Sequence, residues 1–98
     1  MNIEYSKSFK KAVSKLSGKY LESVREMIRE VKQAETVSVL TNCNKLKGFD
    51  NIYRIRVGGY RAFFLFKVIN NTVYFEYFVS RGEAYNKDYM ESLRDKDK

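Results

Sequence analysis

The sequence predicts a single α+β domain over residues 1–98, with helices packed on one face of an antiparallel sheet. Two amphipathic helical stripes occupy the first half of the chain. The second half contains alternating runs separated by the turn-forming pairs Gly58-Gly59 and Asn70-Asn71. A hydrophobic fraction of 44% over 98 residues is enough for one core without disulfides.

The first half is expected to form a strand followed by a helical hairpin. Residues 2–5 can form an opening strand, and Ser6 is a suitable N-cap for the helix that follows. The first helix carries its apolar stripe on Phe9, Ala12, Val13 and Leu16, and Gly18 is expected to end it. The second helix, about residues 20–34, carries its stripe on Leu21, Val24, Met27, Ile28 and Val31. Residues 37–40 predict a short helical turn.

The second half predicts a three-stranded meander over residues 52–57, 60–69 and 72–79. Counting outward from the two turns separates its faces. One face is wholly apolar or aromatic and must pack on the helices; it carries Tyr53, Ile55, Val57, Tyr60, Ala62, Phe64, Phe66, Val68, Val73, Phe75, Tyr77 and Val79. The other face carries Arg54, Arg56, Arg61, Phe63, Leu65, Lys67, Tyr74, Glu76, Phe78 and Ser80.

A short C-terminal helix is expected over about residues 86–94, with Asn86 as its N-cap and a frayed tail behind it. The second sheet face holds an apolar strip of Phe63, Leu65 and Phe78, which is unsuited to open solvent. Two covers are possible. Either the C-terminal helix covers the strip with Tyr89, Met90 and Leu93, or a segment of a partner protein does.

Three arginines should gather on the second face. If the Gly58-Gly59 turn closes, Arg56 faces Arg61 and Arg54 lies two residues back. Like charges directly opposite in a sheet are destabilising, so this patch is expected to hold an anion. Strict alternation points Arg81 towards the helices. We therefore expect the last strand to end or bulge near Ser80, which would free Arg81 to join the others.

Composition limits the chemistry. A net charge of +7 favours a polyanionic partner. The chain has no histidine, no clustered metal ligands, no phosphate-binding glycine loop and no nucleophilic triad, so neither a metal nor a cofactor is expected. The lone Cys43 is expected to be a neutral or structural thiol. With no secretory signal and no apolar run of about 18 residues, we expect a cytoplasmic protein without membrane segments.

Arginine, lysine and tyrosine remain for catalysis. Such a set suits cleavage of RNA by its own 2′-hydroxyl, which needs positioning, stabilisation of phosphorane charge and proton transfer, but no enzyme nucleophile.

Three segments resemble the RelE/ParE superfamily of toxins from type II toxin–antitoxin systems: Lys45-Leu-Lys-Gly48, the run from Tyr53 to Arg61, and Arg81-Gly-Glu-Ala-Tyr85. The resemblance implies a RelE-like fold and a ribosome-dependent mRNA endonuclease (an mRNA interferase) that inhibits translation. It also implies mRNA, the ribosome and a small acidic antitoxin as partners. By position, it assigns catalysis to Arg61, Arg81 and Tyr85, and RNA-backbone binding to Lys45, Lys47, Arg54 and Arg56.

Two features depart from the family pattern. Arg54 and Arg56 stand where the best-studied branch has lysines, and the segment from Arg81 to Tyr85 is shorter than in some members. Two other readings keep the fold and change the activity. One is a ParE-like inhibitor of DNA gyrase, and the other is an inactive relative that only binds RNA or an antitoxin. Tyr85 beside so many arginines favours the RNase.

Overall fold

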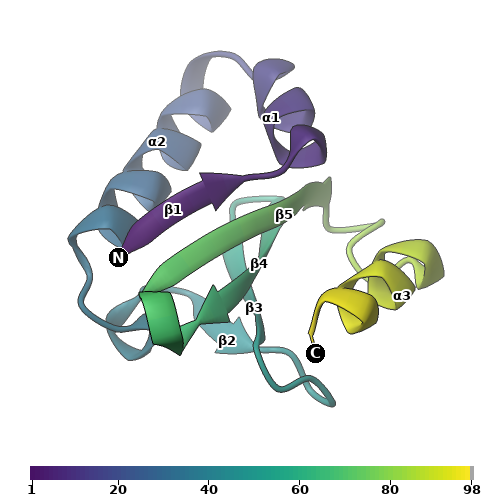
Figure 1. Cartoon of the computed structure of the whole chain (residues 1–98). Helices are drawn as coiled ribbons and strands as arrows, with labels where there is room; N and C mark the ends of the chain where they lie inside the picture. The colour runs from purple at the N-terminus through teal and green to yellow at the C-terminus, as the bar shows by residue number, and fades with distance from the viewer. Residues whose placement is uncertain (98) are drawn as a thin grey trace.

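The computed structural model describes residues 1–97 and has a five-stranded sheet with the strand order β1-β5-β4-β3-β2. The elements in chain order are β1 (Asn2–Tyr5), α1 (Lys7–Ser14), α2 (Gly18–Gln33), η1 (Val37–Val39), β2 (Cys43–Lys45), β3 (Ile52–Val57), β4 (Tyr60–Lys67), η2 (Val68–Asn70), β5 (Thr72–Ser80) and α3 (Lys87–Lys96). β1 runs parallel to β5, and the other neighbours are antiparallel. The α+β prediction is confirmed, with one strand more than expected. Helices α1 and α2 lie on one side of the sheet and α3 on the other (Figure 1).

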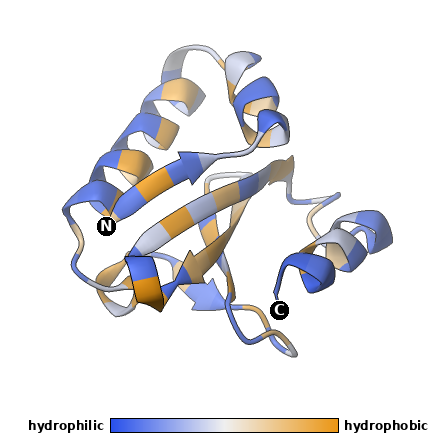
Figure 2. Cartoon of the chain, viewed as in Figure 1, coloured by the Kyte–Doolittle hydropathy of each residue, from blue (hydrophilic) through white to orange (hydrophobic). Residues whose placement is uncertain are grey.

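The predicted helical hairpin is present. The backbone N–H of Phe9 donates to Ser6 Oγ at 3.0 Å, so Ser6 is the N-cap of α1 as expected. Orange apolar bands alternate with blue polar ones along α2, which is the amphipathic pattern that buries Val24, Met27 and Val31 (Figure 2). One boundary was wrong: α1 ends at Ser14, and Gly18, with a φ of 55°, begins α2 instead of ending α1.

The first hairpin has the predicted register, with Val57 opposite Tyr60 and Arg56 opposite Arg61. Of its two glycines only Gly58 has a left-handed φ, at 58°, which favours a type II′ turn. The second turn is not the two-residue turn predicted. β4 ends at Lys67, and the 3₁₀ turn η2 leaves Val68 79% exposed, where the pattern had placed it in the core.

A β-bulge in β5 reverses which sheet face the later residues of that strand occupy, relative to the prediction. Phe63 lies opposite Tyr77 and Phe64 opposite Phe75, so Glu76 is an extra residue. Beyond it the alternation is inverted. Phe78 packs into the core under α1 and α2, while Tyr77 and Val79 face α3. The predicted faces of these three residues were therefore wrong.

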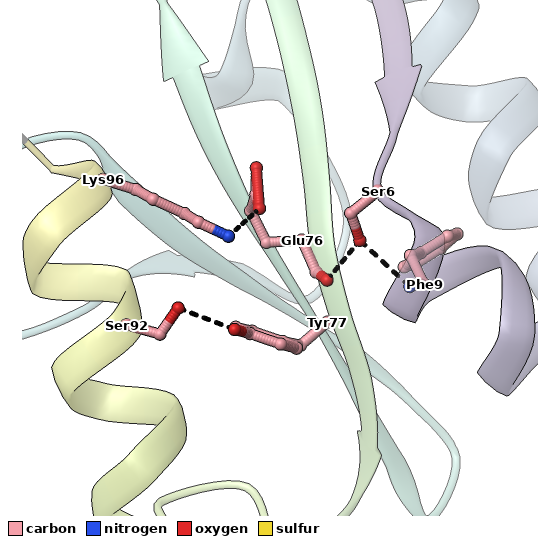
Figure 3. A network of polar contacts seen from close by, with 6 residues as sticks. All are labelled: Ser6, Phe9, Glu76, Tyr77, Ser92 and Lys96. Carbon is pink, nitrogen blue, oxygen red and sulfur yellow. Dashed lines mark hydrogen bonds and ion pairs between the residues drawn. The ribbon is translucent and has the colours of Figure 1, made fainter.

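Helix α3 covers Phe63 and Leu65, the two residues of the predicted apolar strip that stay on this face, so the C-terminal helix is the cover and not a partner segment. Phe63 and Leu65 are buried in a second core with Leu93, and Tyr89 and Met90 pack against it. Figure 3 shows two polar contacts that fasten α3 to β5: Lys96 Nζ to Glu76 Oε2 at 2.6 Å, and Ser92 Oγ to Tyr77 Oη at 2.7 Å.

The end of α3 is also held in place. The backbone N–H groups of Asp50 and Asn51 donate to the Asp97 carboxylate at 2.8 and 2.6 Å. The expectation of a frayed tail was thus wrong for residues 95–97, and Lys98 lies outside the described residues. No helix within residues 1–97 is long and apolar enough to cross a membrane.

Candidate active site

Four arginines meet around the Gly58 turn, on the sheet face that carries α3. Arg56 and Arg61 are cross-strand neighbours. The backbone N–H of Arg81 donates to the Gly59 carbonyl at 2.8 Å, which brings the end of β5 beside the turn. Partial burial lowers the pKa of Arg61, and the charges of Arg56, Arg54 and Arg81 lower it further, in that order. Arg54, Arg56, Arg61 and Arg81 form the arginine cluster.

The bulge at Glu76 explains how Arg81 comes to face the other arginines. Arg61 lies opposite Val79, so the two side chains share a face. Arg81 follows Val79 by two residues and therefore continues on that face. The expected strand end at Ser80 is confirmed, but the irregularity that corrects the phase lies four residues earlier.

Tyr85 is joined to the arginine cluster through Arg54. Nη1 of Arg54 donates a hydrogen bond to the phenolic oxygen of Tyr85. The Tyr85 ring meets the buried Phe63 ring edge-on, with 6.3 Å between centroids, while the side chain stays 54% exposed. Nε of Arg54 is buried without a hydrogen-bond partner among the described residues. A buried, unpaired guanidinium N–H lowers stability, so this arrangement is not explained by folding alone.

A groove of about 430 Å³ continues from Tyr85 between the β2–β3 loop and α3. It is lined by Lys45, Leu46, Lys47, Phe49, Arg54, Tyr85, Met90 and Arg94. The predicted site residues thus occupy two adjoining places. Lys45, Lys47 and Tyr85 border the groove, Arg56, Arg61 and Arg81 surround the turn, and Arg54 belongs to both.

Lys45 is the least central of the predicted residues. It lies opposite Tyr53, whose ring packs against the core under α1 and α2. Cross-strand neighbours project from the same face, so Lys45 leaves the backbone on the far side and borders the groove only at the sheet edge.

Two residues near the site were missed in the sequence. Asn44 lies opposite Arg54 on the edge strand β2, which was not predicted. Arg94 reaches the groove from α3 and holds its guanidinium 4.7 Å from the centre of the Phe49 ring. The spacing of Met90 and Arg94, i and i+4, could have indicated a shared helix face, but not what that face meets.

The described residues form neither a metal site nor a reactive thiol. Within residues 1–97, no three His, Cys, Asp or Glu side chains come together as a metal site. Burial, and secondarily the charge of Glu30, raises the pKa of Cys43 to about 11, so this thiol is neutral at ordinary pH as expected.

The fold and the site together define a small basic domain with a RelE-like fold, with a helical hairpin on one sheet face and an arginine cluster on the other. The chain is 29% identical over 87 residues to the toxin RelE3 of Methanocaldococcus jannaschii, covering 88% of this chain and 97% of that toxin. No family model matches the chain.

Solved structures agree. A RelB–RelE antitoxin–toxin complex from Methanococcus jannaschii contains a chain with a TM-score of 0.72 and 27% identity, covering 88% of this chain and 96% of that one. The RelE–RelB complex of Pyrococcus horikoshii OT3 gives a TM-score of 0.70 at 20% identity, covering 85% and 97%, which supports the fold. The chain is therefore similar in sequence to a RelE toxin, and its fold is that of the RelE chains in antitoxin–toxin complexes.

Proposed function

We propose that this protein is a RelE-type toxin, an endoribonuclease that cleaves mRNA on the ribosome and so inhibits translation. The observation that carries the proposal is the hydrogen bond from Arg54 to Tyr85 at the edge of the arginine cluster. It joins a proton carrier to a phosphate-binding surface, and cleavage through the 2′-hydroxyl needs both.

Arg61 and Arg81 hold the scissile phosphate in this proposal. The 2′-oxygen bonds to phosphorus, the bond to the 5′-oxygen breaks, and the 2′-hydroxyl proton passes to water. Negative charge builds up on the phosphorane oxygens during the step. The Arg61 guanidinium is held by hydrogen bonds from Nη1 to the carbonyls of Gly58 and Tyr60, at 3.2 and 2.9 Å, so it stabilises that charge with little reorganisation. The mutual repulsion that lowers the pKa of Arg61 is relieved when the phosphate binds.

Tyr85 acts as the general acid. Its phenolic oxygen accepts a hydrogen bond from Arg54, so its own proton is left free for another acceptor. That proton goes to the departing 5′-oxygen, giving a 5′-hydroxyl and a 2′,3′-cyclic phosphate. The phenolate that remains is stabilised by the Arg54 guanidinium, an interaction stronger in the transition state than in the ground state. Lys47 and Arg56, with Lys45 at the margin, bind neighbouring phosphates.

An antitoxin is the second partner that we propose. The solved relatives named above are complexes of RelE with RelB. A net charge of +7 favours an acidic protein. Because α3 covers the apolar residues on its own sheet face, we place the antitoxin elsewhere. A largely apolar groove between α1 and α2, bordered by Val13, Leu21 and Ile28, is the surface proposed for it. Co-purification with the protein encoded next to this one tests the pairing, and the absence of any acidic partner there would contradict it.

The cleavage test uses two variants with matched controls. Arg61→Ala and Tyr85→Phe should each slow cleavage of ribosome-bound mRNA by roughly 100-fold or more. Arg29→Ala removes an exposed arginine of α2, and Tyr20→Phe removes a phenol that is 52% exposed; both controls should stay within about twofold of wild type. The products are mapped for 2′,3′-cyclic phosphate ends. Wild-type rates for folded Arg61→Ala and Tyr85→Phe would reject the mechanism, and gyrase-linked DNA breaks without RNA cleavage would replace it with the ParE-like reading.

A further inference from the structure

The groove beside Tyr85 has the composition of a site for one nucleobase. Its floor is apolar, formed by the buried Leu46 and Phe49 together with Met90 of α3. Its rim is cationic, with Lys47, Arg54 and Arg94, and the part of the chain that the structure describes contributes no carboxylate to the lining. A volume of about 430 Å³ lies at the lower end for small-ligand pockets and is suited to a single nucleotide.

Arg94 presents a flat surface inside this groove. Its guanidinium carbon lies over the Phe49 ring, 4.7 Å from the ring centre, so a cation–π contact holds the group beside the groove floor. The side chain is exposed and has no ion pair among the described residues. Single-stranded RNA is commonly bound by stacking unpaired bases on aromatic rings or on arginine planes. Because Arg94 is exposed and lines the groove, its guanidinium is accessible to such a base.

The two sides of the groove are fixed relative to each other. Asp97, at the end of α3, accepts hydrogen bonds from the backbone N–H groups of Asp50 and Asn51, which directly follow Phe49. Leu93, beside Arg94, is fully buried against the sheet. The stacking surface is therefore formed before any ligand arrives, and little ordering opposes binding.

We propose that this groove binds the base of a nucleotide adjoining the scissile phosphate, and that Arg94 stacks between that base and Phe49 as a substrate-binding residue. The inference rests on the proposed function for its substrate class. Arg54 connects the two places: it borders the groove and also belongs to the arginine cluster where the phosphate is bound. A base held there would set the register of the RNA against Tyr85.

The test measures binding, not cleavage. The probe is a fluorescent RNA hexanucleotide with 2′-fluoro substitution, which removes the nucleophile, in a set where each position in turn is abasic. For the wild-type chain, the abasic residue should weaken binding by roughly tenfold at one position. Arg94→Ala should bind the intact probe about as weakly and lose nothing further at that position. Arg94→Lys keeps the charge but not the plane, and should behave like Arg94→Ala.

Arg29→Ala is the matched control. It removes an exposed arginine of α2, which lies on the opposite face of the sheet and does not line the groove, and it should keep the full abasic penalty. All variants should keep thermal midpoints within about 4 °C of wild type, as exposed substitutions do. Wild-type binding by Arg94→Lys would overturn the proposal, because Arg94 would then supply charge alone. An abasic penalty unchanged in Arg94→Ala would overturn it as well.

The two proposals fail separately. Normal cleavage by Arg61→Ala and Tyr85→Phe would contradict the nuclease proposal. The base site is tested separately, by the binding of a probe that cannot be cleaved.

Discussion

Replacing Leu93 by alanine tests whether α3 is an integral part of the domain. Leu93 is fully buried in the second core, where it packs with Phe63 and Leu65 on the sheet face away from α1 and α2. If α3 folds together with the sheet, Leu93→Ala must destabilise the whole domain. If α3 is instead a detachable segment on a surface that binds another protein, Leu93→Ala should lower the free energy of unfolding only slightly.

The size of the effect follows from burial. Truncating a buried leucine to alanine costs about 2–5 kcal/mol, because apolar burial is lost and a cavity remains. We take about 3 kcal/mol for Leu93, since the exposed edge of α3 allows some collapse into the cavity. A domain of this length has an unfolding entropy of about 0.2 kcal/mol/K, so the thermal midpoint should fall by roughly 15 °C.

Urea unfolding followed by circular dichroism measures the free energy directly. Leu93→Ala should lower the midpoint with an unchanged slope, which shows that the cooperative unit is the same. Val39→Ala removes an apolar side chain that is 64% exposed and should change stability by less than about 0.5 kcal/mol. A cost below about 1 kcal/mol for Leu93→Ala would refute the reasoning and would make α3 a detachable segment.

Two further predictions concern the other sheet face. The pKa of Cys43, raised to about 11, should make its reaction with Ellman's reagent at pH 8 roughly 100-fold slower in the native than in the urea-unfolded chain. Because the folded pKa is the higher one, the thiol's contribution to stability is present below about pH 8.5 and is lost as the pH rises through 11. Unfolding free energies of wild type and Cys43→Ala should therefore converge over that range, and a constant difference would contradict the shift. Ser6→Ala removes a cap to Phe9 N at 3.0 Å and a bond to the Glu76 carbonyl at 2.6 Å, and should cost about 1–2 kcal/mol in thermal unfolding. Ser14→Ala, which loses only a local bond to Lys11, should cost less than half of that; equal costs would argue against the cap.

What could be predicted from the sequence was determined locally. The Ser6 cap, the α2 stripe and the pairing of Arg56 with Arg61 each depend on a few neighbouring residues, and all three are confirmed. The cluster of Arg54, Arg56 and Arg61 follows from the turn alone, so its position was accessible before any tertiary structure.

What was missed depends on partners distant in the chain. The strand β2 has three residues, and its pairing with β3 has no local pattern. Arg94 was overlooked for a similar reason: helical periodicity places it near Met90 but cannot tell that the β2–β3 loop lies opposite. No residue at the bulge marks it, because glutamate is not a residue that bulges require.

The bulge residue Glu76 connects the features that the sequence left separate. Its carbonyl accepts the hydrogen bond from the Ser6 cap of α1, and its carboxylate binds Lys96 of α3, so one irregular residue ties together helices on opposite faces (Figure 3). The one-residue shift also turns Phe78 towards Phe9 and places Tyr77 on the sheet face that packs against α3. Without that shift, strict alternation would bury Arg81 under α1 and α2, where an unpaired charge is strongly destabilising. The same extra residue that docks α3 therefore also places Arg81 beside Arg61, so the arginine cluster and the packing of α3 both depend on one irregularity in β5.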